Sequence, residues 1–241
     1  MSAPEPAVRS VDYWDEYAPW YKLWLDHTDY HRGLQALLAA VVRPGWRVLD
    51  IGGGSGVLAF PLVRIGAEVT LVEPSAAMRN LLRTEMKARE LSGLRVIPLP
   101  WESVPAADAA GFDLALASNS LHLTRIGAGP ALRRVLEAGP TQVLVASEAE
   151  IPLTPEDAAA ADYDVAASGS FKADGSFWYH SLEEAGRHLD LKDRHGQPHP
   201  PRAAYLRSLV AREGHFVHER RSTLRWLRLH RTGDGIASRP A

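Results

Sequence analysis

Two acidic residues and a glycine-rich turn are the part of this sequence best suited to chemistry. Asp50 ends a run of β-forming residues two positions before the GGGSG turn at 52–56, and Glu73 ends the next such run. The carboxyl ends of neighbouring parallel strands meet at one edge of a sheet, so both carboxylates should face one site. There, one carboxylate can attract an ammonium group and the other can accept hydrogen bonds from both hydroxyls of a ribose.

Two other ligands of glycine turns fit these residues less well. A phosphate-binding P-loop needs Gly-Lys-Ser/Thr, whereas Gly56 is followed by Val57 and Leu58. A dinucleotide turn is matched only partly, and the carboxylate of Asp50 would repel a pyrophosphate. A nicotinamide-dependent oxidoreductase therefore stays an outside alternative. A ligand with an amine and a ribose but no phosphate, such as S-adenosyl-L-methionine (SAM), suits the turn better.

The elements that must position these residues alternate along the chain. We expect strands at 47–51, 68–73, 95–99, 112–118 and 141–147, and helices at 56–65, 75–90 and 130–136. Pro61 predicts a kink or a late start of its helix. Strands that alternate with helices indicate right-handed βαβ units and a parallel sheet.

The predicted fold class is α/β, with a Rossmann-like, mainly parallel seven-stranded sheet and helices on both faces. Residues 1–42 should form a loose tail and aromatic lid helices, split at Pro19, and 43–149 the core. Residues 150–201 are interpreted as an insertion after strand five, a substrate cap with helices at 154–167 and 182–189. Residues 202–241 should close the core with a helix that starts at Pro201 and a strand pair at 216–221 and 224–230.

Two stretches resemble a known family. VLDIGGGSG at 48–56 and GAEVTLVEPSAAM at 66–78 are similar to the first motif and the second-strand end of class I SAM-dependent methyltransferases. PLPWESVP at 98–105 and ASNSLHL at 117–123 match the stretches after the third and fourth strands, although Pro100 stands where the family often has an acidic residue. The cofactor-binding residues that this resemblance implies are Asp50, Gly52, Gly54, Gly56, Glu73, Met78, Trp101, Glu102, Ser118 and Asn119.

The roles carried by the resemblance follow the parts of SAM. The glycines would line the methionine portion and Glu73 would hold the ribose. Met78, Trp101 and Glu102 would surround the adenine, and Ser118 and Asn119 would lie near the transferred methyl group. S-adenosyl-L-homocysteine (SAH) would be the product.

Residues for the acceptor side come from two places. His122, just past the fourth strand, is a candidate general base, because an imidazole titrates near working pH, although a structural histidine fits as well. The aromatic segment 13–33 resembles the lid helices of small-molecule methyltransferases; the alternative is an amphipathic helix packed on the sheet edge. Within it we take Tyr21 and His31 as catalytic candidates. The candidate substrate contacts are Tyr17, Trp20 and His27.

Composition limits the partners and the compartment. The 241 residues carry a net charge of −2, so no basic field indicates nucleic-acid binding, and the lack of cysteine excludes disulfides and thiolate metal sites. His27 and His31 are spaced like a metal-chelating pair but lack a third ligand, so we expect no metal. The sequence has no signal-peptide pattern and no membrane-spanning apolar run. We expect a cytoplasmic monomer or homodimer with no membrane or nucleic-acid partner.

The reaction expected from this pattern is methyl transfer from SAM to a small-molecule acceptor by in-line displacement in a lidded pocket. Ser118-Asn119-Ser120-Leu121 stands where enzymes that methylate amino groups of DNA bases or glutamine carry Asn/Asp-Pro-Pro-Tyr/Phe. Two alternatives remain open: transfer of the aminocarboxypropyl group of SAM, and a non-catalytic SAM-binding protein.

Overall fold

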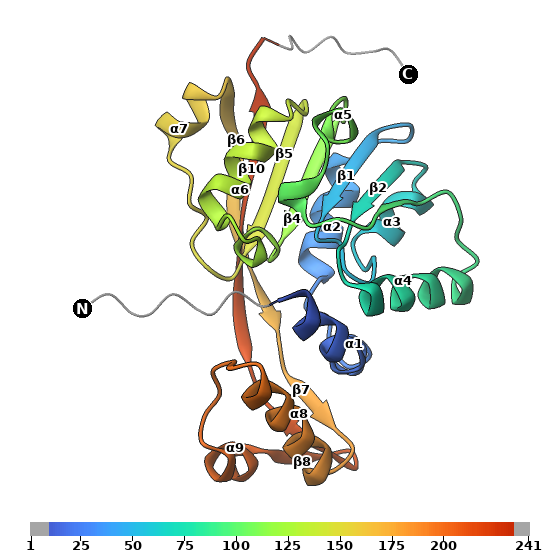
Figure 1. The fold of residues 1–241 in the computed structure, drawn as a ribbon, viewed down its shortest axis with the longest axis vertical. Coiled ribbons are helices and arrows are strands. Elements are labelled where there is room, and N and C mark those ends of the chain that lie inside the picture. The colour runs from blue at the N-terminus through green and yellow to red at the C-terminus, as the bar shows by residue number, and fades with distance from the viewer. Residues whose placement is uncertain (1–9, 234–241) are drawn as a thin grey trace.

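A computed structural model describes residues 10–233, and Figure 1 shows two lobes joined by long strands. The larger lobe is built on a seven-stranded sheet of order β3-β2-β1-β4-β5-β10-β6, and the smaller lobe holds a sheet of order β7-β9-β8. The tail expected at 1–10 lies outside the described residues, except for Ser10. Within 10–233, no helix is long and apolar enough to cross a membrane.

The central sheet has the predicted mainly parallel topology. Its strands are β1 (Arg47–Ile51), β2 (Glu68–Val72), β3 (Arg95–Ile97), β4 (Leu114–Ser118), β5 (Gln142–Ser147), β6 (Tyr163–Asp174) and β10 (Arg221–Arg231). β1 pairs in parallel with β2 and β4, whereas β10 runs antiparallel between β5 and β6. The carboxyl ends of β1, β2 and β4 therefore share one edge of the sheet, where ligands bind in open α/β folds.

Helices cover both faces of this sheet, and two clusters of buried apolar residues lie under them. The helices of the larger lobe and of its junction are α1 (Val11–Leu25), α2 (Arg32–Val41), α3 (Ala59–Arg64), α4 (Ala76–Ala88), α5 (Ala106–Ala109), α6 (Ala128–Glu137) and α7 (Pro155–Ala160), with short 3₁₀ turns η1 (Trp101–Ser103) and η2 (Leu121–Leu123). The hydroxyl of Ser75 caps α4 by accepting from the N–H of Met78, as expected. The Rossmann-like fold class is confirmed.

The smaller lobe corrects the predicted boundaries. It comprises β7 (Phe177–Tyr179), α8 (Leu182–Arg194), α9 (Arg202–Ser208), β8 (Val210–Arg212) and β9 (His215–His218). The inserted segment thus follows the sixth core strand, and the helix expected at 154–167 ends at Ala160. The expected closing pair at 216–221 and 224–230 is also wrong, because β10 pairs with β5 and β6. The small, exposed residues of β6 lack the alternation that marks a half-buried strand.

Helix α1 lies at the junction of the lobes and is not split at Pro19. Asp15 Oδ1 accepts hydrogen bonds from Ser75 Oγ (2.6 Å) and from the N–H of Ala77 (3.0 Å), which fixes α1 on the start of α4. These contacts and the packing against β7 and α8 hold the helix despite the backbone bond that proline cannot make. The late helix start predicted from Pro61 is confirmed, because α3 begins at Ala59 and the proline lies in its first turn.

Candidate active site

The glycine turn connects β1 to α3 and is fixed to the end of β2. The N–H of Gly52 donates to the carbonyl of Val72 over 2.8 Å. Gly52 has φ +69°, and a Cβ there would lie 2.4 Å from Cβ of Ser120, so only glycine fits without displacement. The turn therefore offers bare backbone to a ligand at the carboxyl edge of the sheet.

Asp50 and Glu73 lie beside this turn and are almost fully buried, with 2% and 7% of their surface exposed. Glu73 accepts hydrogen bonds from the N–H groups of Ser75 (2.7 Å) and Gly54 (3.1 Å), whereas Oδ2 of Asp50 has no partner among the described residues. Burial, reinforced for Asp50 by the charge of Glu73, raises the pKa of each carboxyl to about 7. A buried carboxylate oxygen without a donor is costly, so this site calls for a cationic or hydroxylated ligand.

These two carboxylates fit the amino end and the sugar of SAM. An ammonium group would supply the donor that Asp50 Oδ2 lacks, and a ribose diol would donate to Glu73. Met78 is buried, and its Cε would lie 3.1 Å from a Cβ added at Gly54, so the methionine side chain lies directly against the turn. The groups at the turn are two carboxylates and backbone amides, and the turn lacks the Gly-Lys-Ser/Thr ending that holds a diphosphate in a P-loop.

Tyr21 and His31 cover the same end of the sheet from the α1–α2 segment. The phenol oxygen of Tyr21 lies 3.5 Å from Nε2 of His31. Burial and then the charges of Asp50 and Glu73 raise the pKa of the Tyr21 phenol. Burial lowers the pKa of His31 to about 4, and its Nδ1 has no partner among the described residues. The imidazole is therefore neutral at pH 7, with one unprotonated ring nitrogen, and burial opposes its protonation in the ligand-free protein.

A polar network beside His31 was not foreseen from the sequence. The hydroxyl of Tyr30 donates to Oε1 of Glu148 (2.7 Å) and accepts from Nδ2 of Asn119 (2.9 Å). Oδ1 of Asn119 accepts from the N–H of Glu148 (2.8 Å), so both ends of this amide are used. Asn119 and Glu148 directly follow the ends of β4 and β5. Polar residues at the carboxyl ends of parallel strands were the signal used for Asp50 and Glu73, and the same signal would have identified Glu148.

The remaining cofactor candidates differ in their burial and in their hydrogen-bond partners. Trp101 is buried against α6, and its indole N–H donates to the carbonyl of Ala131 over 3.1 Å. Oε1 of Glu102 accepts from the N–H of Arg125, and its Oε2 is buried without a partner in residues 10–233. Ser118 Oγ is buried and has no hydrogen-bond partner in this range either. Their assignment to adenine and methyl contacts stays a prediction.

The remaining acceptor-side candidates make contacts of their own, several of them with the smaller lobe. Trp20 stacks on His188 of the smaller lobe at 4.9 Å between ring centroids, and Tyr17 lies 5.6 Å from the same imidazole. His27 stacks on Trp178, and His122 is exposed on η2. No cluster of metal-binding side chains occurs within 10–233, and the roles of these four candidates stay predictions.

Comparison with known proteins agrees with this geometry. Residues 48–139, which contain the glycine turn, Asp50, Glu73 and Asn119, match the family model described as a methyltransferase domain. Over these residues the chain is similar to the methyltransferase domain family. The match begins at β1 and ends after α6, so it covers the part of the chain that carries the cofactor candidates.

One curated relative and two solved structures illustrate the likeness. The chain is 40% identical over 78 residues to a ubiquinone biosynthesis O-methyltransferase of Methylocella silvestris, covering 32% of this chain and 29% of that protein. The [4+2]-cyclase SpnF superposes with a TM-score of 0.62 at 20% identity, covering 94% of this chain and 97% of the cyclase. A candidate RNA methyltransferase from Pyrococcus horikoshii gives 0.56 at 15% identity, covering 87% and 89%. At these identities the structures show the fold, which hosts different chemistries.

Proposed function

We propose that this protein transfers the methyl group of SAM to a small-molecule acceptor. The observation that carries the proposal is the buried pair Asp50 and Glu73 beside the glycine turn, with one carboxylate oxygen of Asp50 lacking a donor. When bound, SAM would supply an electrophilic methyl group on a positively charged sulfur. The chain would contribute binding, alignment and the exclusion of water.

His31 and Tyr21 are the residues we assign to the acceptor. The Tyr21 hydroxyl lies 3.5 Å from Nε2 of His31, and Tyr30, the neighbour of His31, is bonded to Asn119 after β4. We therefore assign His31 to the side of the site at the end of β4, near the methyl group of a SAM held by Asp50. Its neutral imidazole would take the proton of an acceptor hydroxyl or thiol as the new bond forms. The aromatic rings of Trp24 and Tyr30 contact His31 and keep water out.

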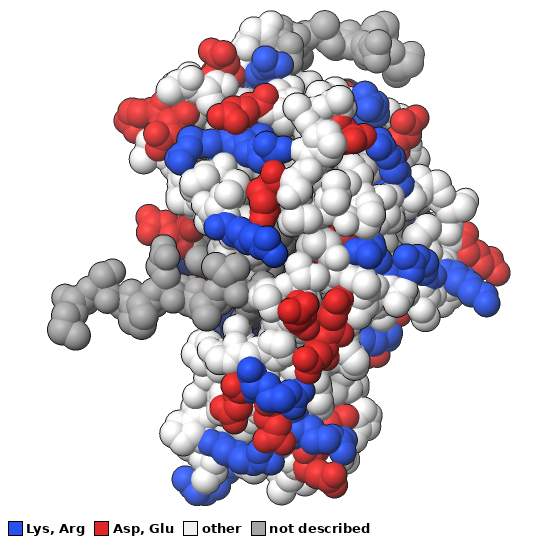
Figure 2. Space-filling model, viewed as in Figure 1, with Lys and Arg blue, Asp and Glu red and all other residues white. Residues whose placement is uncertain are grey.

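A small acceptor is favoured by the surface charge. Figure 2 shows acidic and basic side chains interspersed over the visible face, and the formal net charge is −2. A protein that tracks a nucleic-acid backbone needs a basic stripe that neutralises several phosphates. The relative from Methylocella silvestris is named for ubiquinone biosynthesis, which supports a small aromatic acceptor as the first to test.

The cofactor part of the proposal is tested by calorimetric titration with SAH, and with NADH as the negative probe. Wild-type protein should bind SAH and not NADH, and Glu73→Ala should abolish SAH binding because the ribose loses its carboxylate. Asp164→Asn is the matched control, since Asp164 is an exposed carboxylate at the start of β6. Binding of NADH in preference to SAH, or wild-type affinity in Glu73→Ala, would overturn the assignment.

The reaction itself is tested by incubating the protein with SAM and a panel of phenols, thiols, amines and RNA. Mass spectrometry then identifies the sulfur-containing product. SAH together with a methylated small molecule is the expected result. Methylthioadenosine would indicate aminocarboxypropyl transfer, and methylated RNA would show that the acceptor is RNA and not a small molecule. Tight SAM binding without any product would indicate a non-catalytic protein.

A further inference from the structure

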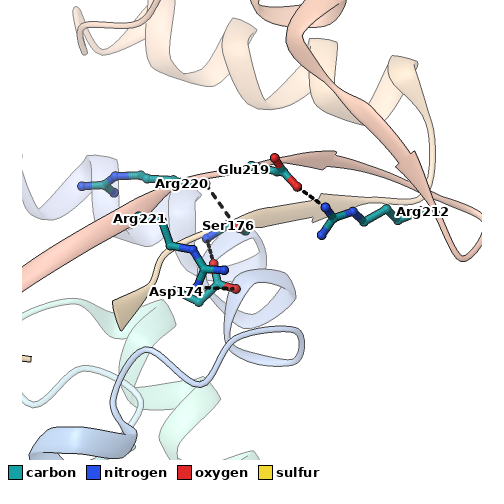
Figure 3. Close-up of a pocket in the computed structure, with 6 residues that line it drawn as sticks. All are labelled: Asp174, Ser176, Arg212, Glu219, Arg220 and Arg221. Carbon is teal, nitrogen blue, oxygen red and sulfur yellow. Dashed lines mark hydrogen bonds and ion pairs between the residues drawn. The ribbon is translucent and has the colours of Figure 1, made fainter. Parts of the chain in front are cut away.

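Two chain segments, 174–176 and 219–221, link the lobes, and we call them the lobe crossing. The N–H of Gly175 donates to the carbonyl of Arg220 (2.9 Å), and the N–H of Arg220 donates to Oγ of Ser176 (3.1 Å). Figure 3 shows the crossing together with Arg212 around a shallow hollow. Because the two segments are bonded to each other, they behave as one unit at the base of the smaller lobe.

The lobe crossing also holds the segment that carries His31. The indole N–H of Trp24 donates to the carbonyl of Gly175 over 3.3 Å, and the hydroxyl of Thr28 donates to the carbonyl of Asp174. Trp24 lies in the last turn of α1, and Thr28 lies in the stretch between α1 and α2, just before His31. The place of this stretch is therefore set by the crossing as well as by the larger lobe.

Glu148 makes a third contact between the lobe crossing and the segment that carries His31. Its Oε1 accepts from the hydroxyl of Tyr30 and its Oε2 from the guanidinium of Arg220. Its backbone N–H donates to Asn119, and its carbonyl accepts from Arg225. In Figure 3 the Arg220 guanidinium points away from the other side chains of the hollow. The Glu148 side chain thus bridges the lobe crossing and the residue next to His31.

His31 has little to fix it by itself. Its Nδ1 makes no hydrogen bond within the described residues, and Nε2 meets Tyr21 only at 3.5 Å. A long contact of this kind contributes little, so the imidazole depends on the backbone and on the rings around it. The bonded neighbour Tyr30 is the side chain best placed to hold that backbone.

We propose that Glu148 and Arg220 are positioning residues that, through Tyr30, hold His31 over the ends of β1 and β4 and tie that placement to the smaller lobe. This inference goes beyond the proposed function and rests on it only for the meaning of His31 as a base. We assign neither residue a contact with the reacting atoms. Their effect is on where the imidazole lies and on how much solvent reaches it.

The test measures how fast diethyl pyrocarbonate modifies each histidine, by mass spectrometry of proteolytic peptides. This reagent reacts with neutral imidazole that it can reach. His31 should be slow in wild-type protein, and both Glu148→Gln and Tyr30→Phe should speed its modification at least tenfold. The double variant should be no faster than the single ones, because the two changes interrupt one chain of contacts: Tyr30→Phe removes the bond to Glu148, and Glu148→Gln leaves one acceptor oxygen where Tyr30 and Arg220 need two. Glu150→Gln, an exposed neighbour, is the matched control and should leave the rate unchanged.

The modification rates of two other histidines distinguish a local change at His31 from partial unfolding of the whole protein. His188 is 1% exposed in the smaller lobe and should stay protected, while the exposed His122 should react at one rate in all variants. An unchanged rate at His31 in both variants, or a rise that His188 shares, would overturn the inference. SAH affinity should stay within twofold in Glu148→Gln, and with an acceptor from the screen kcat should fall while the KM for SAM holds. If wild-type protein does not bind SAH, the proposed function fails, and the rate at His31 still decides this inference.

Discussion

The backbone N–H of Gly54 donates a hydrogen bond to Oε2 of Glu73 across 3.1 Å, so the glycine turn is attached to the carboxylate that we assign to the ribose. This bond joins the first and second strand ends of the sheet before any ligand is present. The turn is thereby preorganised, and a ligand need not order it on binding. What ligand binding must change is the protonation of the buried carboxyls.

SAH affinity should therefore depend on pH. The pKa of Asp50 and of Glu73 is raised to about 7, so below that pH the ligand must displace protons to meet carboxylates. Affinity should rise between pH 6 and 8, by up to about tenfold per unit for each proton released below the pKa. Calorimetry in buffers of different ionisation enthalpy counts these protons. A pH-independent affinity without proton release would contradict the ionic role of the pair.

The stability of the ligand-free protein should fall with rising pH because of Asp50, whereas SAH affinity should rise. A carboxyl whose pKa is raised on folding, here from 3.8 to about 7, stabilises the fold at low pH and loses this contribution as pH rises through that window. Asp50→Asn should remove this loss and raise the free energy of unfolding at pH 8 by about 1–3 kcal/mol. Urea unfolding of the variant, wild type and Asp164→Asn at pH 5 and 8 measures it. A less stable Asp50→Asn at pH 8 would show that the carboxylate has a donor.

The variant must be compared with wild type at each pH, because His188 makes stability fall with falling pH, whereas Asp50 makes it fall with rising pH. Its pKa is lowered to about 2, first by burial, so its contribution to stability is lost as pH falls below the ordinary value of 6.5. The difference between Asp50→Asn and wild type cancels this background.

Substitution of Gly56 should cost more than strain alone. Gly56 has φ +82°, and a Cβ there would lie 2.4 Å from Cδ1 of Leu82. Gly93 has φ +86° with nothing within 4 Å of an added Cβ, so Gly93→Ala isolates the backbone term of about 1 kcal/mol. Gly56→Ala should lose a further 1–3 kcal/mol or so through overpacking. Equal losses in urea unfolding would mean that Leu82 moves aside freely.

Replacement of His31 should separate chemistry from cofactor binding. His31→Gln should leave SAH affinity unchanged and lower kcat by roughly 10²–10⁴, because the acceptor proton loses its base. His122→Ala in the same assay tests the sequence-based assignment of the exposed histidine. An undiminished kcat in His31→Gln would remove it from the catalytic residues.

The cofactor side of this protein could be predicted from sequence because its signals are local. The turn, Asp50 and Glu73 follow buried strands whose apolar runs identify them, and the structure places both carboxylates at the expected strand ends. Parallel strands with short connections leave little choice of topology. The family match over 48–139 covers this same region.

The acceptor side was harder because its contacts are long-range. Glu148 bonds to Tyr30, 118 residues away in the sequence, and to Arg220, 72 residues away. No local sequence pattern predicts such pairs. The edge strand β6 is exposed along most of its length, so its residues resemble a loop. Pro19 was interpreted as a helix break, whereas packing of α1 between the lobes holds the helix through it.

The place of β10 between β5 and β6 has a consequence for biosynthesis. β6 reaches the central sheet only through β10, which is made last of the seven strands, after the whole smaller lobe has been synthesised. Until residues 221–231 arrive, the growing polypeptide has an unpaired strand edge on β5 and a detached β6. Such edges recruit foreign strands, so this nascent chain should be a client for holding chaperones late in translation.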